Sequence, residues 1–319
     1  MKIIPEIDVL QNIEVPAHLG AFQRNVPLAE HTTIQIGGPA EIFASPADTE
    51  TLKAWIAWAR SIDIPHWILG GGANILVSDK GFPGIVLSTR NLNHCRIDSR
   101  LNDGTCVVEL GAGTEVSAAC NWACENGLAG LDFLYAMPGT IGGAVWMNAR
   151  CYGSEIAAIL ESVQYLDPEH GLKEYHFRET DWAYKHSPFQ AASMVLLSAR
   201  FRLHAGDPQA IRQRMQQFRS DRTEKGHFRF PSAGSTFKNN YDYGKPTGII
   251  IDELHLRGRK IGGAQIAPYH GNIFINTGNA TATDMRRLIT EVQEIARNTL
   301  GIDLEPEVLY VGDWTGYED

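Results

Sequence analysis

The chain has 319 residues, of which 44% are hydrophobic and 20% charged, and its formal net charge is −9 at pH 7. This composition is typical of an ordinary globular protein with one large core or two unequal ones. The negative charge argues against a nucleic-acid partner, because binding to a phosphate backbone requires a basic face. Pro5 and two acidic residues interrupt the first apolar residues, and no later stretch is long enough, so we expect neither a signal peptide nor a membrane span.

The cysteines show no pattern of a metal site or of a disulfide framework. There are five of them, with no CxxC pair and no histidines at zinc-finger spacing. Cys120 and Cys124 lie one helical turn apart and are expected to be buried packing residues. We therefore predict no structural metal and a reducing, cytoplasmic location.

Helices and strands are expected to alternate in the first part of the chain. Ser45 is expected to cap a helix that ends near Ser61, with Pro46 in its first turn and Asp48 near its positive end. A second helix is expected over 116–126, with Gly127 as its stop. Strands are expected at 66–69, 75–77, 85–87 and 106–110.

The composition turns polar at 205–208, and the pattern becomes helical after it. An amphipathic helix follows with Ile211, Met215 and Phe218 on its buried face. The clearest helix comes last, with apolar residues from Met285 to Ala296 on one face and Gly301 at its end. We place a domain boundary here, which divides the chain into 1–205 and 206–319.

Glycine is concentrated in four loops, two of which directly follow strands. Such loops let a backbone approach a ligand closely, and their successive N–H groups form concave anion sites. No loop fits GxGxxG or the P-loop pattern. Each loop alone is expected to be a tight turn, but the four together favour a dinucleotide ligand. They span Gly37–Ala40, Gly70–Asn74, Gly111–Gly113 and Pro138–Ala144.

Three polar segments could carry chemistry. Ser235 lies in a glycine-flanked loop, outside any G-x-S-x-G elbow, so serine-hydrolase chemistry has little support. Its hydroxyl could still donate a proton if its neighbours orient it. Glu307 lies in a segment with a second carboxylate, and Lys185 lies between aromatic residues. Taken alone, these would be a turn residue, a solvated strand edge and a surface cation.

In their order along the chain these segments resemble the UDP-N-acetylenolpyruvoylglucosamine reductase (MurB) family. The resemblance covers nearly the whole chain from about His31. It implies an α+β fold with an FAD-binding part of the vanillyl-alcohol-oxidase type, made of two α+β subdomains that meet near residues 70–90, and a C-terminal α+β substrate domain. The matching stretches are 31–33, 36–40, 70–76, 130–134, 137–144, 147–149, 231–239, 251–252, 262–264, 270–272, 280–284 and 304–308.

The resemblance also implies FAD as the cofactor, NADPH as the reductant and the enolpyruvyl ether of UDP-N-acetylglucosamine as the substrate, in the synthesis of a peptidoglycan precursor. Two loops would hold the cofactor. The pyrophosphate would lie against Gly70, Gly71, Gly72, Ala73 and Asn74. The flavin side would be completed by Pro138, Gly139, Thr140, Gly142, Gly143 and Ala144.

For catalysis the resemblance implies that a hydride passes from NADPH through the flavin to C3 of the enolpyruvyl group. Ser235 would then protonate C2, and a protonated Glu307 with a nearby cation would stabilise the enolate. Tyr184, Asn239 and Lys225 match substrate-binding residues, with Lys225 on the diphosphate. The sequence gives no local signature for NADPH over NADH or for an oligomeric state.

The chain departs from the family at a few positions. Lys185 stands where the family has an arginine, which keeps the charge but loses the planar two-pronged donor. Arg150 could assist, and Asn240 replaces the usual proline. Two other functions stay open at this point. One is another FAD-dependent oxidase or dehydrogenase of the same fold, and the other is a non-catalytic nucleotide-sugar-binding descendant.

Overall fold

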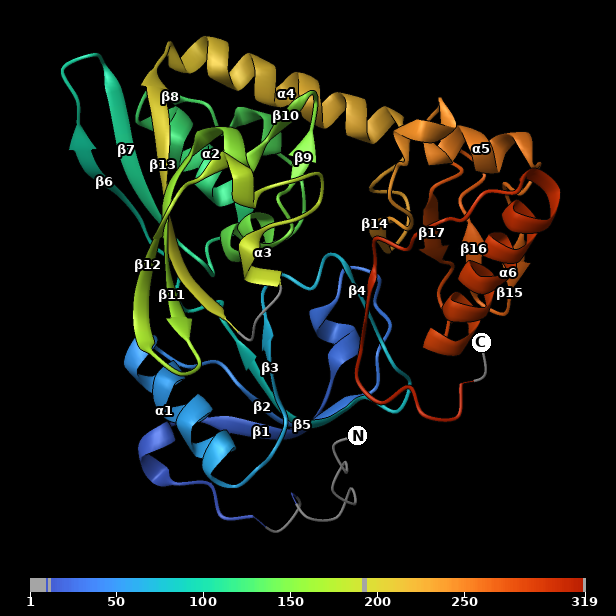
Figure 1. The fold of residues 1–319 in the computed structure, drawn as a ribbon, viewed down its shortest axis with the longest axis horizontal. Helices are drawn as coiled ribbons and strands as arrows, with labels where there is room; N and C mark the ends of the chain where they lie inside the picture. The colour runs from blue at the N-terminus through green and yellow to red at the C-terminus, as the bar shows by residue number, and fades with distance from the viewer. Residues whose placement is uncertain (1–9, 11–12, 191–193, 318–319) are drawn as a thin grey trace.

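Three large sheets with their covering helices form most of the described protein, and a long helix runs between two of them (Figure 1). Two smaller sheets have two strands each: β4 with β18, and β9 (Arg150–Cys151) with β10 (Ser154–Glu155). The computed structural model describes residues 10, 13–190 and 194–317. Among these residues, no helix combines the length and the apolar character needed to cross a bilayer.

The first sheet has the strand order β1-β2-β5-β3, in which β5 pairs in parallel with both neighbours and β1 is antiparallel to β2. Helix α1 (Thr49–Ser61) buries Leu52 and Trp55 against it. The expected cap at Ser45 is wrong, because Asp48 caps α1 and accepts a hydrogen bond from Thr51 N at 2.8 Å. The strands are β1 (Phe22–Pro27), β2 (Pro39–Ala44), β3 (His66–Leu69) and β5 (Phe82–Ser88).

The second sheet is antiparallel, with the order β12-β11-β13-β7-β6 and with β8 on β13. Helices α2 (Val116–Glu125) and α3 (Ile141–Trp146) belong to its core. Cys120 and Cys124 are buried in this core, as the sequence predicts. The strands are β6 (Cys95–Arg100), β7 (Thr105–Gly111), β8 (Leu128–Ala129), β11 (Leu160–Asp167), β12 (Gly171–His176) and β13 (Val195–Ala205).

The third sheet lies at the other end of helix α4 (Pro208–Glu224) and has the order β14-β17-β16-β15. Helices α5 (Thr247–Glu253) and α6 (Ala282–Leu300) pack beside it. The expected last helix and its stop at Gly301 are confirmed. The strands are β14 (Ser232–Ser235), β15 (Lys260–Ile261), β16 (Ala264–Ile266) and β17 (Ile273–Asn276).

After α6 the chain returns to the N-terminal half of the protein, where it pairs with β4. Strand β18 (Leu309–Val311) pairs in parallel with β4 (Ile75–Val77). Ile34, Ile36 and Leu76 are buried in the same cluster as the apolar face of α6. Asp79 also accepts hydrogen bonds from the first two backbone N–H groups of α6, at 2.7 and 2.9 Å. The segment around β4 is therefore joined to α6 by packing and hydrogen bonds, and to β18 by strand pairing.

Candidate active site

The two glycine loops predicted to hold the cofactor lie against each other. A side chain at Gly71 would place its Cβ 2.4 Å from the Cα of Gly139, so the two backbones touch where no side chain fits. In the part of the chain that the structure describes, the backbone N–H groups of residues 71–74 make no hydrogen bond. Four successive free N–H groups in a glycine turn form an anion cradle that fits a pyrophosphate.

The loop Gly70–Asn74 is held in place by the segment His31–Thr33. Gly72 has φ +64°, and a Cβ there would lie 2.0 Å from the carbonyl oxygen of His31. Thr33 N donates to Gly72 O at 3.0 Å, and the Thr33 hydroxyl donates to Ser232 O at 2.8 Å. The loop is therefore fixed to the segment His31–Thr33, which also contacts strand β14.

Asn74 connects the same loop to the predicted catalytic glutamate. Its side-chain amide donates to the carbonyl oxygen of Glu307 at 3.1 Å, and its own carbonyl oxygen accepts from Leu309 N at 3.1 Å. Asn74 thus fixes the backbone at Glu307 beside the loop expected to hold the cofactor.

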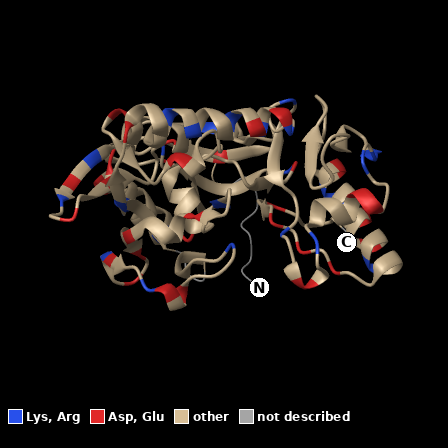
Figure 2. Cartoon of the chain, turned by 90° about the horizontal axis from the view of Figure 1, so that it is seen from above, with Lys and Arg blue, Asp and Glu red and all other residues tan. Residues whose placement is uncertain are grey.

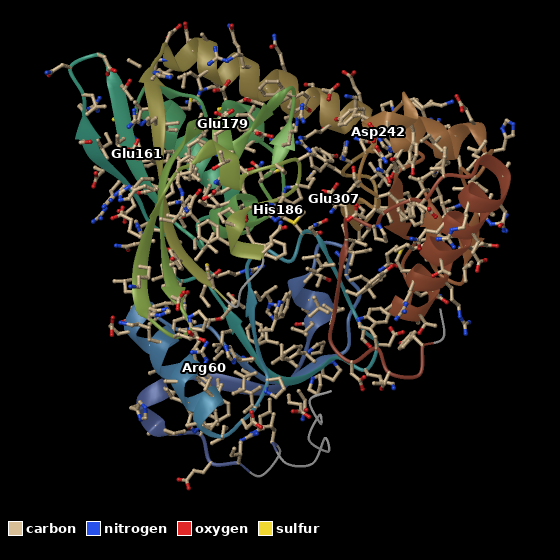
Figure 3. The ribbon with its side chains drawn as sticks, in the orientation of Figure 1. Arg60, Glu161, Glu179, His186, Asp242 and Glu307 are labelled. Atoms are coloured by element: carbon tan, nitrogen blue, oxygen red, sulfur yellow. The ribbon has the colours of Figure 1, made fainter. Side chains whose placement is uncertain are left out.

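Lys185 and Glu307 form an ion pair in this region, with 2.6 Å between Nζ and Oε1. Their side chains are only 15% and 9% exposed. Lys185 has φ +57°, at the left-handed position of the tight turn 183–186, a conformation that is uncommon for residues other than glycine. Glu307 lies beside this turn, between the two main bodies of the protein (Figure 3).

Ser235 directly precedes a residue that is hydrogen-bonded to the backbone of Glu307. Gly234, with φ +78°, lies at an irregularity in the pairing of β14 with β17. The next carbonyl oxygen, that of Thr236, accepts a hydrogen bond from Glu307 N at 2.8 Å. The hydroxyl of Ser235 has no partner among the described residues, so it is available to a ligand.

Two of the three predicted substrate-binding residues join this group. Tyr184 precedes Lys185, and its hydroxyl accepts a hydrogen bond from Asn239 N at 3.3 Å. The side-chain oxygen of Asn239 accepts from Thr247 N, which fixes the amide. The guanidinium of Arg150 lies 5.8 Å from the centre of the Tyr184 ring, beside the turn that carries Lys185.

Lys225 lies at the C-terminal end of α4. Its side chain is 54% exposed and pairs with Asp221 at 2.9 Å, and Asp221 also accepts from the Tyr152 hydroxyl at 2.8 Å. Burial raises the pKa of the nearby Cys151 thiol, and the charge of Arg222, a hydrogen bond with Arg222 and the charge of Lys185 oppose that rise.

Arg222 and Tyr152 lie beside Lys225 and Asp221, although their sequence contexts predict no role for them. Arg222 is buried, its guanidinium lies 5.5 Å from the centre of the Tyr152 ring, and its Nε has no hydrogen-bond partner among the described residues. The spacing of three residues between Arg222 and Lys225 was the available signal, since this spacing places both near one face of a helix end.

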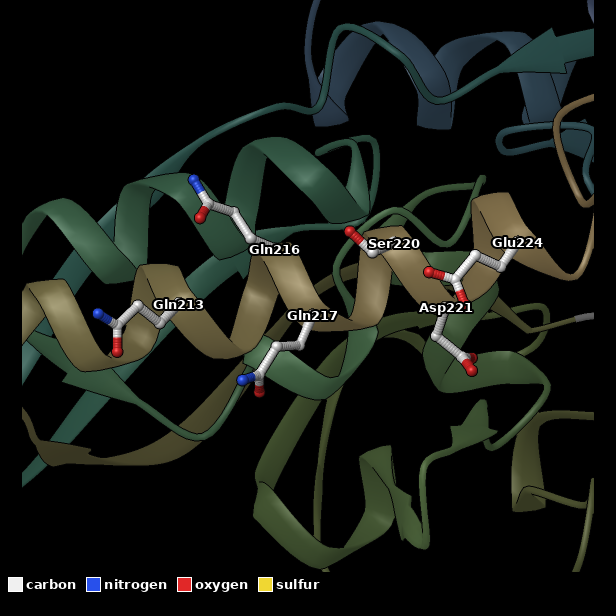
Figure 4. Close-up of a pocket in the computed structure, with 6 residues that line it drawn as sticks. All are labelled: Gln213, Gln216, Gln217, Ser220, Asp221 and Glu224. Carbon is white, nitrogen blue, oxygen red and sulfur yellow. The ribbon is translucent and has the colours of Figure 1, made fainter.

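A shallow polar depression on α4 does not belong to this site (Figure 4). All of its lining residues lie on the one helix, so it is helix surface without an opposite wall. They are Gln213, Gln216, Gln217, Ser220, Asp221 and Glu224.

Known proteins are similar to this chain over most of its length. Residues 226–311 match the family pattern described as "UDP-N-acetylenolpyruvoylglucosamine reductase, C-terminal domain", and residues 40–172 match that of an FAD binding domain. The UDP-N-acetylenolpyruvoylglucosamine reductase of Treponema denticola is 41% identical over 307 residues, which cover 92% of this chain and 95% of the relative. The chain belongs to the UDP-N-acetylenolpyruvoylglucosamine reductase family.

Two further comparisons agree. The UDP-N-acetylenolpyruvoylglucosamine reductase of Synechococcus sp. is 38% identical over 94% of this chain and 97% of its own length. The crystal structure of the enzyme from Thermus caldophilus superposes with a TM-score of 0.75 at 31% identity, and covers 91% of this chain and all of that one. The expected family and α+β fold with an FAD-binding part are confirmed, and the protein is an FAD-dependent oxidoreductase.

Proposed function

We propose that this protein reduces the enolpyruvyl ether of UDP-N-acetylglucosamine to UDP-N-acetylmuramate, with FAD as cofactor and NADPH as reductant, in peptidoglycan precursor synthesis. One observation carries the proposal: the cofactor cradle, the Lys185–Glu307 pair and the strand with Ser235 are joined by direct hydrogen bonds through Asn74 and Thr236. All five cysteines are free thiols, which supports the proposed cytoplasmic location.

The residues present fit FAD. The free N–H groups of 71–74 would bind the pyrophosphate. Close contact between Gly71 and Gly139 places the second loop directly beside the first. The neighbouring wall would then be lined by Pro138, Gly139, Thr140, Gly142, Gly143 and Ala144. When bound, FAD supplies hydride transfer.

The residues of this chain supply charge and a proton. The ammonium of Lys185 would bind the substrate carboxylate and stabilise the negative charge that develops there and on C2. Glu307 accepts a hydrogen bond from this ammonium, so it holds the Lys185 side chain in place before substrate enters. The role of Glu307 as a neutral acid would require the ion pair to rearrange on substrate binding.

Ser235 would hold the proton that is delivered to C2 of the substrate. Its hydroxyl has no partner within the described chain, so no existing hydrogen bond must break for it to donate. Tyr184 and Asn239, which are joined by a hydrogen bond, would orient the substrate, and Lys225 would bind the diphosphate as a point charge.

The absorbance of the purified protein tests the proposal. A flavin spectrum that NADPH bleaches and that the enolpyruvyl substrate restores without oxygen is the expected result. A colourless protein would contradict the cofactor assignment. Bleaching that only oxygen or another acceptor reverses would contradict the substrate assignment and favour an oxidase of the same fold.

A further inference from the structure

A compact group of basic and aromatic side chains lies where the end of α4 meets the loop after β16. The rings of His227 and His270 are 6.0 Å apart. Gly226 has φ +81°, and a Cβ there would lie 2.5 Å from the ring of Tyr269, so the two segments are in close contact. Figure 2 shows basic residues along α4, with acidic residues toward its end. The group consists of Arg222, Lys225, His227, Arg229, Tyr269 and His270.

Two unpaired polar atoms in this group indicate a ligand. Within the described residues, three buried side-chain polar atoms have no hydrogen-bond partner, and two of them are Nε of Arg222 and the hydroxyl of Tyr269. An unsatisfied buried polar group is costly and rare, so each requires an explanation. Since Arg222 is nine-tenths buried and both atoms can donate, a ligand rich in acceptor oxygens would satisfy them.

The group is connected to the proposed catalytic strand. Asn272 N donates to Nδ1 of His270 at 3.1 Å, and the carbonyl oxygen of Asn272 accepts from Thr236 N at 2.9 Å. Thr236 directly follows Ser235. A sugar nucleotide whose reacting end lies at Ser235 therefore has this basic group within its length.

His227 is held neutral by its surroundings. Burial lowers its pKa to about 4, and the positive charges of Arg222, His270 and Lys225 add to this, while Asp221 opposes it. Burial also lowers the pKa of His270. The charge of Asp252 opposes this lowering, and the charges of Arg257 and Lys225 add to it. Arg229 lies over the Tyr269 ring, at 5.0 Å from its centre. The negative charge of an anion bound among these cations would counteract them and raise the pKa of His227.

We propose that His227 takes up a proton from solvent when the diphosphate of the sugar nucleotide binds against Arg222 and Lys225. The inference rests on the proposed function, because it assumes that substrate class. His227 is the acceptor rather than His270, since Nδ1 of His270 already accepts from Asn272 N and its other ring nitrogen then carries the hydrogen. The protonated imidazole donates to a phosphate oxygen, and binding becomes tighter as the pH falls.

Calorimetry of the FAD-loaded, full-length protein with UDP-N-acetylglucosamine tests this. That probe is a diphosphate diester, so it does not itself titrate near pH 6. If the anion restores the ordinary histidine pKa of about 6.5, about 0.7 proton is taken up per complex at pH 6.0, and affinity is about tenfold higher at pH 5.5 than at pH 7.5. Two buffers of different ionisation enthalpy give the proton count directly.

Two variants locate the proton. In His227→Gln the proton uptake should fall near zero, and the affinities at pH 5.5 and pH 7.5 should agree within about twofold. His170 is an exposed histidine paired with Asp167, so His170→Gln should keep the wild-type proton uptake and the wild-type pH dependence of affinity. Binding without proton uptake in the wild-type protein would overturn this inference and leave the proposed function intact. Failure of the probe to bind at any pH would overturn the inference and also count against the proposed substrate class.

Discussion

Removal of the Lys185 ammonium should destabilise the protein and slow the reaction by separable amounts. In Lys185→Met, the Glu307 carboxylate keeps its 9% exposure but loses its cation at 2.6 Å. Removal of one partner of a buried ion pair lowers the free energy of unfolding by about 3–5 kcal/mol. Because both side chains of this pair are slightly exposed, we expect a loss of about 3 kcal/mol. With a denaturant slope of about 3 kcal/mol/M, the urea midpoint should fall by about 1 M.

The chemistry should suffer independently of stability. Loss of one preformed charge at the site of a developing oxyanion costs about a hundredfold to a thousandfold in rate. We expect Lys185→Met to show this loss in the re-oxidation of the flavin by substrate, under conditions where the protein is folded. Lys185→Arg restores the charge and the forked donor, so it should stay within about tenfold of the wild-type rate.

A double-mutant cycle and a second, more exposed ion pair show whether the loss of stability comes from the Lys185–Glu307 contact itself. Glu307→Gln and Lys185→Met together should cost about 2 kcal/mol less than the sum of the single changes, because the second change removes the stranded charge. Lys238→Met breaks a more exposed pair with Glu305, 30% and 69% exposed, and should cost under about 1 kcal/mol. Additive single changes, or a midpoint shift for Lys185→Met no larger than that for Lys238→Met, would refute the reasoning.

Three further predictions concern the loop at Gly71, the contact of Asp79 with α6, and the hydrogen bond between Tyr152 and Asp221. Gly71→Ala should weaken FAD binding at least tenfold by flavin fluorescence titration, because its Cβ would meet Gly139. Asp79→Ala should cost about 1 kcal/mol in urea unfolding at pH 7, as for a lost helix cap. Tyr152→Phe should raise the KM for substrate several-fold in steady-state assays with kcat nearly unchanged, because Asp221 loses the hydroxyl that helps to hold it.

The variants at Gly71 and Tyr152 each have a control. Gly248→Ala places its Cβ 3.4 Å or more from its neighbours and should leave FAD affinity within about twofold. Tyr175→Phe removes a similar hydroxyl-to-aspartate bond, to Asp181 at 3.0 Å, and should leave KM unchanged. Equal effects of a variant and its control would contradict the corresponding prediction.

The effect of Asp79 depends on pH in a defined direction. Burial raises its pKa, but the hydrogen bonds from Thr283, Ala282 and Tyr317 outweigh this and lower it below 3.8. A depressed folded pKa gives stability that is present above the unfolded value near 3.8 and is lost as pH falls through the folded value. The difference in free energy of unfolding between wild type and Asp79→Ala should therefore be largest at pH 7 and become smaller below pH 3.8.

The local pattern of the sequence predicts the glycine loops, the final helix and the four strands β3, β4, β5 and β7, because turn residues and apolar periodicity act over short distances. It misplaces the first cap, since Ser45 and Asp48 compete for one helix start and only the observed geometry shows that Asp48 satisfies the N–H of Thr51. The resemblance supplied Ser235 and Glu307 as candidates, but their catalytic roles stay a prediction.

The contacts that assemble the site could not be predicted in this way. The hydrogen bond between Asn74 and Glu307 joins residues 233 positions apart, and the parallel pairing of β18 with β4 that accompanies it leaves no local pattern. The ion pair of Lys185 depends on a left-handed turn that propensity disfavours. The unpaired Nε of Arg222 becomes visible only when its burial is known.

Rapid mixing of the Ser235→Ala variant tests the central claim most directly. Reduction of its flavin by NADPH should match that of the wild-type protein, because the hydroxyl has no part in that step. Re-oxidation of the reduced flavin by the enolpyruvyl substrate, followed without oxygen, should be at least a hundredfold slower, because the proton donor to C2 is gone. Re-oxidation within a few-fold of the wild-type rate would contradict the assignment of Ser235 and the site built around it.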